Sequence, residues 1–360
     1  MNQDLPFMPG FASQGMLVPD YVVRVEGVPL PPAVRRAIVS VTVTHQVNQP
    51  ASFQMQVNDP QLLLIDAAQG LLAEGRRVEI DVGYAGNTLP VIEGEIAAIG
   101  VNLDDGGGLT LQVEGFDGLH TGTRGTGYRQ FREDQSDSAV VRQIAGDMLP
   151  IAVVDETGPR SAGRIQHNVN NLQYLQQMAQ FHGFQLWVAG RTLYFMRRRP
   201  AMPAVFAKGV NLISFSTRLS TTGQVGEIEV RGWDPARKEP VSGRAFAARG
   251  GSGLKALSAT GLAQVLGAGA GKHKQVIHAQ GEVSSRAEAQ ARADAAMLEQ
   301  SSSLLSASGS VVGDPQLRVG STVSLQNMGR FSLQSYLIER LTHQIDQAGY
   351  RTSFEMKLAP

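Results

Sequence analysis

Apolar and polar residues alternate along much of the first 120 residues, which is the pattern of strands that bury one face. The segments 39–44 and 52–57 alternate without a break, and Asp104–Gly108 has the composition of a hairpin turn. Further predicted strands are 21–25, 78–82 and 109–113. We therefore expect residues 19–120 to form one antiparallel β module. Prolines and glycines interrupt every period in residues 1–18, which predicts an N-terminal arm.

The spacing becomes helical between residues 121 and 205. Ser136-Asp137 and Asn170-Asn171 are suitable N-caps for two amphipathic helices, and Gly183 stands where the second helix should end. A hairpin is predicted after it, with strands at 184–188 and 192–195. This part of the chain is expected to form a small α+β module.

Strand patterns return in residues 206–360, which we expect to form a second β module. A Gly/Ala-rich stretch, 243–274, has little periodicity and predicts a loop. Ser285 and Glu288 have the spacing of a capping box and open an Ala-rich helix over 284–300. The strands predicted here are 210–215, 227–231, 322–325, 336–342 and 353–358.

One order of elements occurs twice in the chain. Gly75 is followed by strand patterns at 78–82, 94–99 and 109–113, and Gly320 by strand patterns at 322–325, 336–341 and 351–356. In both sets a glycine-containing turn precedes the last strand. Two copies of one β module would explain this order, and so would the general likeness between antiparallel sheets. The fold class predicted from these patterns is mainly β, with an α+β insert.

Composition and charge narrow the range of functions. The 32 Lys and Arg residues balance 32 Asp and Glu residues, so the excess of basic charge that is typical of nucleic-acid-binding proteins is absent. The chain contains no cysteine, which excludes disulfides, thiolate-held metals and thiol nucleophiles. Residues 1–6 do not resemble a secretory signal, and the apolar run 62–65 is far shorter than the roughly 20 residues of a membrane-spanning helix. We expect a product made in the cytoplasm that does not insert into a membrane.

The sequence shows no assembled catalytic, cofactor-binding or metal site. Gly267–Lys272 lacks the first glycine of a phosphate-binding loop and the hydroxyl residue after the lysine. The seven histidines include no HExxH pattern. The carboxylate pairs Asp104-Asp105 and Glu93/Glu95 have the character of a turn and of a solvated strand face. Arg197–Arg199 is either a solvated strand end or a contact for an acidic partner. We predict that the chain is not an enzyme and needs no cofactor.

Several stretches taken together resemble a known family. They are Val91–Ile96 followed by Leu109–Asp117, Gln173–Ala179 followed by 183–186 and 193–195, the Ala-rich segment 284–297, and Gly313–Gly320 followed by Tyr336, His343 and 349–354. In this order and spacing they resemble the phage late control protein D family, the baseplate hubs of contractile tails. They are also similar to the N-terminal hub part of VgrG proteins of type VI secretion.

This resemblance implies two tube-like antiparallel β-barrel modules per chain, flanking a small α+β module, and a homotrimer that forms a pseudo-sixfold ring. Such a hub joins a sixfold inner tube to a threefold spike and contacts other baseplate proteins within a virion or phage-tail-like particle. Because the sequence ends at Pro360, we expect the spike to be a separate protein. The residues that we expect on ring-forming strands are Val78, Ile80, Val82, Leu109, Leu111, Val113, Val323, Leu325, Phe354 and Met356. The alternatives are a cell-wall hydrolase of a tail and a carbohydrate-binding β protein.

Overall fold

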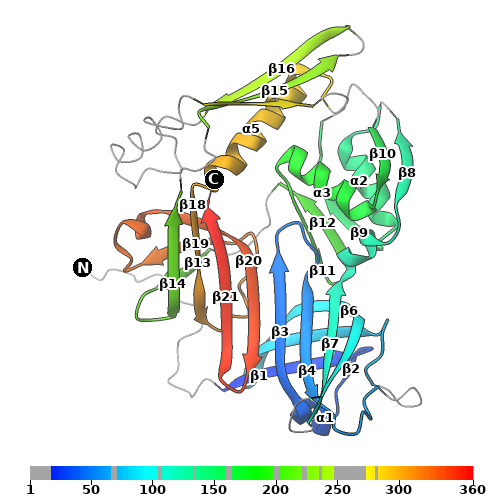
Figure 1. The fold of residues 1–360 in the computed structure, drawn as a ribbon, viewed down its shortest axis with the longest axis vertical. Helices are drawn as coiled ribbons and strands as arrows, with labels where there is room; N and C mark the ends of the chain where they lie inside the picture. The colour runs from blue at the N-terminus through cyan, green and yellow to red at the C-terminus, as the bar shows by residue number, and fades with distance from the viewer. Residues whose placement is uncertain are drawn as a thin grey trace.

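In the computed structural model, a single sheet of 13 strands forms the body of the molecule, so the chain is mainly β as expected (Figure 1). The structure describes residues 18–65, 71–103, 108–132, 134–158, 164–197, 203–220, 225–234, 237–246, 273–279 and 283–359. The strands follow one another across the sheet in the order β14 (Leu212–Leu219), β18 (Leu305–Val312), β21 (Gly349–Leu358), β20 (Ser335–Asp346), β3 (Ile38–Gln46), β4 (Ser52–Asn58), β7 (Leu109–Asp117), β6 (Asn87–Leu103), β5 (Arg77–Tyr84), β1 (Pro19–Val25) and β2 (Val28–Pro29). Beside this path, β19 (Thr322–Gln326) pairs with β20 and with β13 (Ala204–Ala207).

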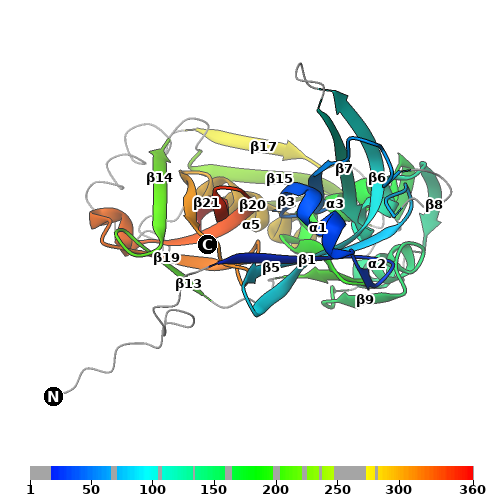
Figure 2. The ribbon, with the colours of Figure 1, turned by 90° about the horizontal axis from the view of Figure 1, so that it is seen from below.

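The first eight of these strands, β14 to β6, lie side by side in Figure 1, and we call them the eight-strand row. Every neighbouring pair within the row is antiparallel. The hairpin of β6 and β7 projects beyond the rest of the sheet (Figure 2). A short helix, α1 (Pro32–Ala37), precedes β3, and a 3₁₀ turn, η3 (Gly329–Leu333), precedes β20.

The order of elements that occurs twice in the sequence also occurs twice in the strand pairing. The strands β3, β4, β5, β6 and β7 correspond to β14, β18, β19, β20 and β21, each set with the same neighbours. Gly75 and Gly320 have φ angles of +84° and +80°, and their N–H groups donate to the carbonyls of Ile96 and Ile338 at 2.8 Å. A bulge follows Ile96 in β6 and Ile338 in β20. The two sets are therefore copies of one arrangement, down to the irregularity of a single strand.

The two copies join within the chain where β3 pairs with β20. Residues 41–46 of β3 lie opposite residues 340–345 of β20, in antiparallel register. Each copy has its own cluster of buried apolar residues. Val43, Met55 and Val113 belong to the first, and Phe206 and Phe354 to the second. Both copies thus belong to one continuous sheet.

The middle of the chain forms the α+β part that was expected from its helical spacing. Helix α2 (Asp137–Gly146) is capped by Ser136, and α3 (Asn171–His182) begins with a capping box at Asn170 and ends at Gly183, whose φ is +65°. The remaining elements here are η1 (Gly118–Thr123), β8 (Gly127–Phe131), β9 (Ile151–Val154), β10 (Arg164–Val169), β11 (Gln185–Ala189) and β12 (Thr192–Met196). The predicted caps and hairpin are confirmed.

The prediction of a loop over 243–274 is wrong at both ends. Residues 243–246 belong to β16 (Glu239–Phe246), and Lys274 opens β17 (Lys274–His278). Both strands pair with β15 (Glu227–Asp234), and α5 (Arg286–Ser302) packs on this small sheet. A Cβ atom at Gly243 would lie 2.3 Å from the backbone of Ala289 in α5. The small residues of β16 therefore reflect a close strand–helix contact rather than a turn; residues 247–272 and the arm over 1–17 lie outside the described part of the chain.

Candidate functional site

The eight-strand row has one face on the apolar cores and one polar face. Strand alternation places every second residue on each face. The register shows which residues share the polar face, because residues directly opposite each other point the same way. Its members include Thr42 and Thr44 of β3, Gln54 and Gln56 of β4, Gln112 and Glu114 of β7, Asn102 of β6, Thr342 and Gln344 of β20, Ser353 and Glu355 of β21, Ser308 of β18 and Ser216 of β14. We call this surface the polar face.

Short hydrogen bonds link neighbouring side chains across the polar face. The hydroxyls of Thr44 and Thr342 lie 3.2 Å apart across the joint between the two copies. In β7, the Gln112 amide donates to Glu114 at 2.6 Å. Ser214 and Ser310 are 2.8 Å apart between β14 and β18. The side chains therefore satisfy much of their hydrogen-bonding capacity among themselves and present water with hydroxyl and amide groups.

The charged residues on the polar face are more often basic than acidic: Arg218, Arg340, Arg351 and Lys357 share it with Glu114 and Glu355. Arg340 is 3.5 Å from Glu355 on the neighbouring strand. Arg218 on β14 and Glu114 on β7 stand near opposite ends of the row.

None of the residues that were predicted for ring-forming strands lies on the polar face. Nine of the ten are buried in the two apolar clusters, and Leu109 is half-buried. Their strands are β5, β7, β19 and β21, of which β7 and β21 belong to the eight-strand row. The alternation identified the buried half of each strand. The polar residues of the same strands were not singled out, although Ser, Thr, Gln and Asn recur there at every second position and indicate the polar face.

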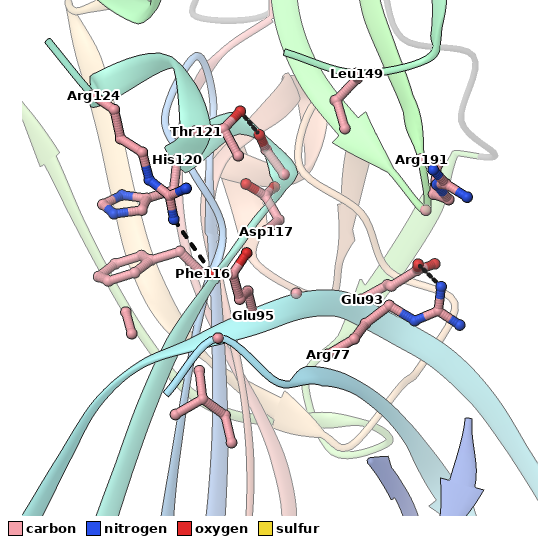
Figure 3. A pocket seen from close by; sticks show the side chains of 16 residues that line it. Arg77, Glu93, Glu95, Phe116, Asp117, His120, Thr121, Arg124, Leu149 and Arg191 are labelled. Atoms are coloured by element: carbon pink, nitrogen blue, oxygen red, sulfur yellow. Dashed lines mark hydrogen bonds and ion pairs between the residues drawn. The ribbon is translucent and has the colours of Figure 1, made fainter. Parts of the chain in front are cut away.

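A separate pocket of about 370 Å³ lies where β5, β6 and η1 meet (Figure 3). Glu95 and Glu93, which the sequence offered as a carboxylate pair, lie within 3.3 Å of Arg124 and 3.7 Å of Arg77, respectively. His120 stacks on Phe116 with ring centroids 4.5 Å apart, and burial lowers the pKa of His120. Both glutamates of this pocket are therefore committed to ion pairs.

Asp117 is the buried carboxyl beside this pocket. Burial raises its pKa to about 7, although backbone hydrogen bonds with Ala51 and Leu119 act in the opposite direction. The carboxylate accepts the Leu119 N–H at 3.0 Å and so caps η1. The hydrogen bonds with Ala51 and Leu119 hold the backbone in place, so we interpret Asp117 as a structural residue.

Two further buried carboxylates hold elements together. Asp137 accepts two hydrogen bonds from the Arg164 guanidinium, at 2.7 and 2.8 Å, and lies 2.7 Å from Nε2 of His182. This contact ties α2 to β10 and α3. In the small sheet, hydrogen bonds from Lys274 and then Arg231 lower the pKa of Glu229 to about 2.

The other sequence candidates are placed as follows. The N–H of Arg197 donates to the Asp155 carboxylate at 2.8 Å. Asp104-Asp105, Arg198, Arg199 and Gly267–Lys272 lie outside the described residues. Within the described ranges, no three His, Asp or Glu side chains gather as metal ligands would. The helices that the structure describes include none with the length and hydropathy needed to cross a bilayer.

Comparison with known proteins adds a family match and a set of related folds. The family model for the Alg8 N-terminal domain matches residues 16–347. No curated protein matches the sequence. The 43 kDa tail protein of prophage MuSo2 from Shewanella oneidensis is 14% identical with a TM-score of 0.67, and the match covers 94% of this chain and 98% of that one.

Two further solved structures have the same fold. The tail protein from Neisseria meningitidis MC58 is 12% identical with a TM-score of 0.68, over 94% of this chain and 96% of that one. The E. coli c3393 protein is described as a component of the type VI secretion system with structural similarity to phage T4 tail proteins. It is 13% identical with a TM-score of 0.56, over 94% of this chain and 77% of that one. The chain therefore has a fold found in tail proteins.

Proposed function

The chain belongs to the Alg8 N-terminal domain family, and from its tail-protein fold we propose that it is the structural baseplate hub of a phage tail or contractile injection particle. In this role it assembles as a homotrimer in the manner of the late control protein D family. The trimer joins a sixfold inner tube to a threefold spike. The work of such a hub is architectural and requires no catalysis.

The observation that carries the proposal is the duplicated strand arrangement. Each chain contains two copies with the same strand neighbours, the same glycine contact and the same bulge. Three chains then present six similar units around one axis. A ring of this kind has threefold symmetry in its sequence and approximate sixfold symmetry in its backbone, so it can match a partner of either symmetry.

The polar face supports the same proposal. In a ring that closes through the eight-strand row, one face of the sheet lines the central opening and the other packs on the apolar cores. The apolar clusters cover the core face of the row, so the polar face is the one left for the opening. The lining is then the Ser, Thr, Gln and Asn surface described above, together with the basic side chains that share this face. The partners that follow are a spike protein and an inner tube protein, within a virion or a similar particle.

The mass of the chain in solution tests the proposal. Light scattering on the purified chain, alone and mixed with the spike protein encoded beside it, should give about three times 38.6 kDa for the hub in at least one sample. A chain that stays monomeric in both samples would contradict the hub. The trimer interface should be of the large obligate class, above roughly 2,000 Å².

A further inference from the structure

The pocket where β5, β6 and η1 meet belongs to the first copy of the duplicated arrangement, and the second copy holds different side chains at the same place. The glycine contacts and the bulges align the two copies position by position. By this alignment the pocket residues Gly94, Glu95 and Asp117 correspond to Tyr336, Leu337 and Leu358, respectively. These three counterparts are at most 7% exposed. The second copy therefore fills with aromatic and aliphatic side chains the place where the first copy keeps a pocket lined by charged groups.

Two arginines of this pocket are paired with carboxylates of the pocket itself. Arg124 lies 3.3 Å from Glu95, and Arg77 lies 3.7 Å from Glu93. The four side chains are between 26% and 64% exposed, so water screens both pairs and a guest carboxylate can compete with them. The planar guanidinium group of arginine matches the geometry of a carboxylate. The pocket is thus already built around contacts between arginine and carboxylate.

Arg191 is the third arginine of the pocket. It follows Gly190 in the turn between β11 and β12, and a Cβ atom at Gly190 would lie only 3.3 Å from Oε2 of Glu93. Arg191 is exposed and makes no ion pair or hydrogen bond within the part of the chain that the structure describes. Figure 3 shows Arg124 and Arg191 on opposite sides of the pocket. Arg191 therefore offers a positive charge to a group from outside the chain.

The size and the walls of the pocket suit a short protein segment. Its volume of about 370 Å³ lies at the small end of the range for ligand pockets, which fits a side chain rather than a nucleic-acid duplex. Leu149 and the stacked rings of Phe116 and His120 provide an apolar wall. Burial lowers the pKa of His120, so this ring is uncharged at neutral pH. An aliphatic stem can pack on this wall while its charged end reaches an arginine.

We propose that this pocket is a docking site for an acidic segment of another protein, whose Asp or Glu side chain binds Arg191. The guest carboxylate meets the same kind of partner that Glu93 and Glu95 meet within the chain. Complementary charge of this kind gives an interface its specificity. Because the counterpart positions of the second copy are filled, a protein that binds this pocket distinguishes the two copies, which the shared backbone does not. The proposal concerns the single chain and does not rest on the trimer.

Binding of a labelled tetraglutamate peptide, capped at both ends and followed by fluorescence anisotropy, tests the charge of the guest. Arg191→Ala should weaken binding about tenfold, because it removes a hydrogen bond between charged groups. Glu95→Gln should strengthen binding severalfold, because it frees Arg124 and removes a like charge. The matched control, Arg237→Ala, removes an exposed arginine from another hairpin turn, between β15 and β16, and should leave the affinity unchanged. Urea unfolding shows whether each variant is folded.

A capped tetralysine peptide and inorganic phosphate identify the outcomes that would overturn the proposal. Tetralysine binding that Glu95→Gln weakens and Arg191→Ala strengthens would show a site for a cation. Equal loss of tetraglutamate binding in Arg191→Ala and Arg237→Ala would show only a general attraction of the surface. Displacement of the peptide by phosphate at lower concentration than by unlabelled tetraglutamate would show a phosphate site, and failure of tetraglutamate to bind at millimolar concentration would show no acidic site at all. The full chain is used at whatever mass light scattering gives, so each of these results would leave the hub standing.

Discussion

Asp117 is a buried carboxyl that resembles a catalytic group but has a structural role. It is buried, its pKa is raised to about 7, and it caps η1 through the Leu119 N–H. Below about pH 4 the carboxyl is protonated in the folded and the unfolded chain alike. Between about pH 4 and 7 the unfolded chain loses this proton and the folded chain keeps it. Stability therefore falls as the pH rises through this window.

The variant Asp117→Asn should remove this pH dependence while its amide oxygen still accepts the Leu119 N–H. The free energy of unfolding of the variant, minus that of the unchanged protein, should rise by on the order of a few kcal/mol from pH 5 to pH 8. Urea unfolding at the two pH values measures the difference. Asp147→Asn removes the same charge at an exposed site next to Arg129 and serves as the control. A stability difference that is constant with pH would contradict the raised pKa of Asp117.

At the scale of elements, the contact between β16 and α5 depends on a missing side chain. A Cβ at Gly243 would lie 2.3 Å from the backbone of Ala289 and Gln290, which cannot move away as a side chain could. Gly243→Ala should therefore destabilise the chain by about 1–3 kcal/mol, as overpacking does. Gly146→Ala, whose Cβ would have nothing within 4 Å, should be close to neutral. Chemical denaturation of both variants checks the contrast, and equal effects would exclude the close contact as the cause.

Local signals in the sequence predicted most elements correctly. The caps of α2 and α3, the end of α3 at Gly183 and the capping residue of α5, Ser285, are short-range features that need no tertiary information. Period-2 alternation likewise located most strands of the large sheet, but β18 and β13 of that sheet and the short strands β8, β9, β10, β16 and β17 were not predicted. The Gly/Ala-rich segment failed because a strand built to fit against a helix has the same composition as a loop, and only the packing partner distinguishes the two.

At the scale of the whole molecule, strand partners are beyond what periodicity can predict. β3 and β20 are neighbours although about 300 residues separate them in sequence, and their pairing joins the two copies. Alternation gives each strand two faces, so the sequence identified the buried face and missed the edges β6 and β14. The duplication was visible in the sequence as an order of elements, but its significance for assembly depends on which copy has its edge covered.

The two copies also provide a matched pair of positions that separates folding from assembly. Leu103 in β6 and Ile345 in β20 are counterparts, one 69% exposed and the other 6% exposed. Leu103→Lys places a charge on an open strand edge, where lysine blocks pairing. At a dilution where both proteins are monomeric, the variant should stay within about 0.5 kcal/mol of the original stability, as surface changes do. At higher concentration it should fail to form the trimer, and the original protein alone should gain stability from assembly. Urea unfolding and light scattering measure the two effects separately.

Ile345→Lys should act in the opposite way, because its charge falls in a joint that is already closed within the chain. A buried charge without a partner should lower the free energy of unfolding by about 3–5 kcal/mol. If Leu103→Lys destabilised the single chain as much as Ile345→Lys, the β6 edge would already be covered within the chain. If Leu103→Lys left the trimer intact, the edge would lie outside the interface. Loss of assembly at one position and loss of folding at its counterpart would show that the chain uses one joint twice, once within itself and once between copies.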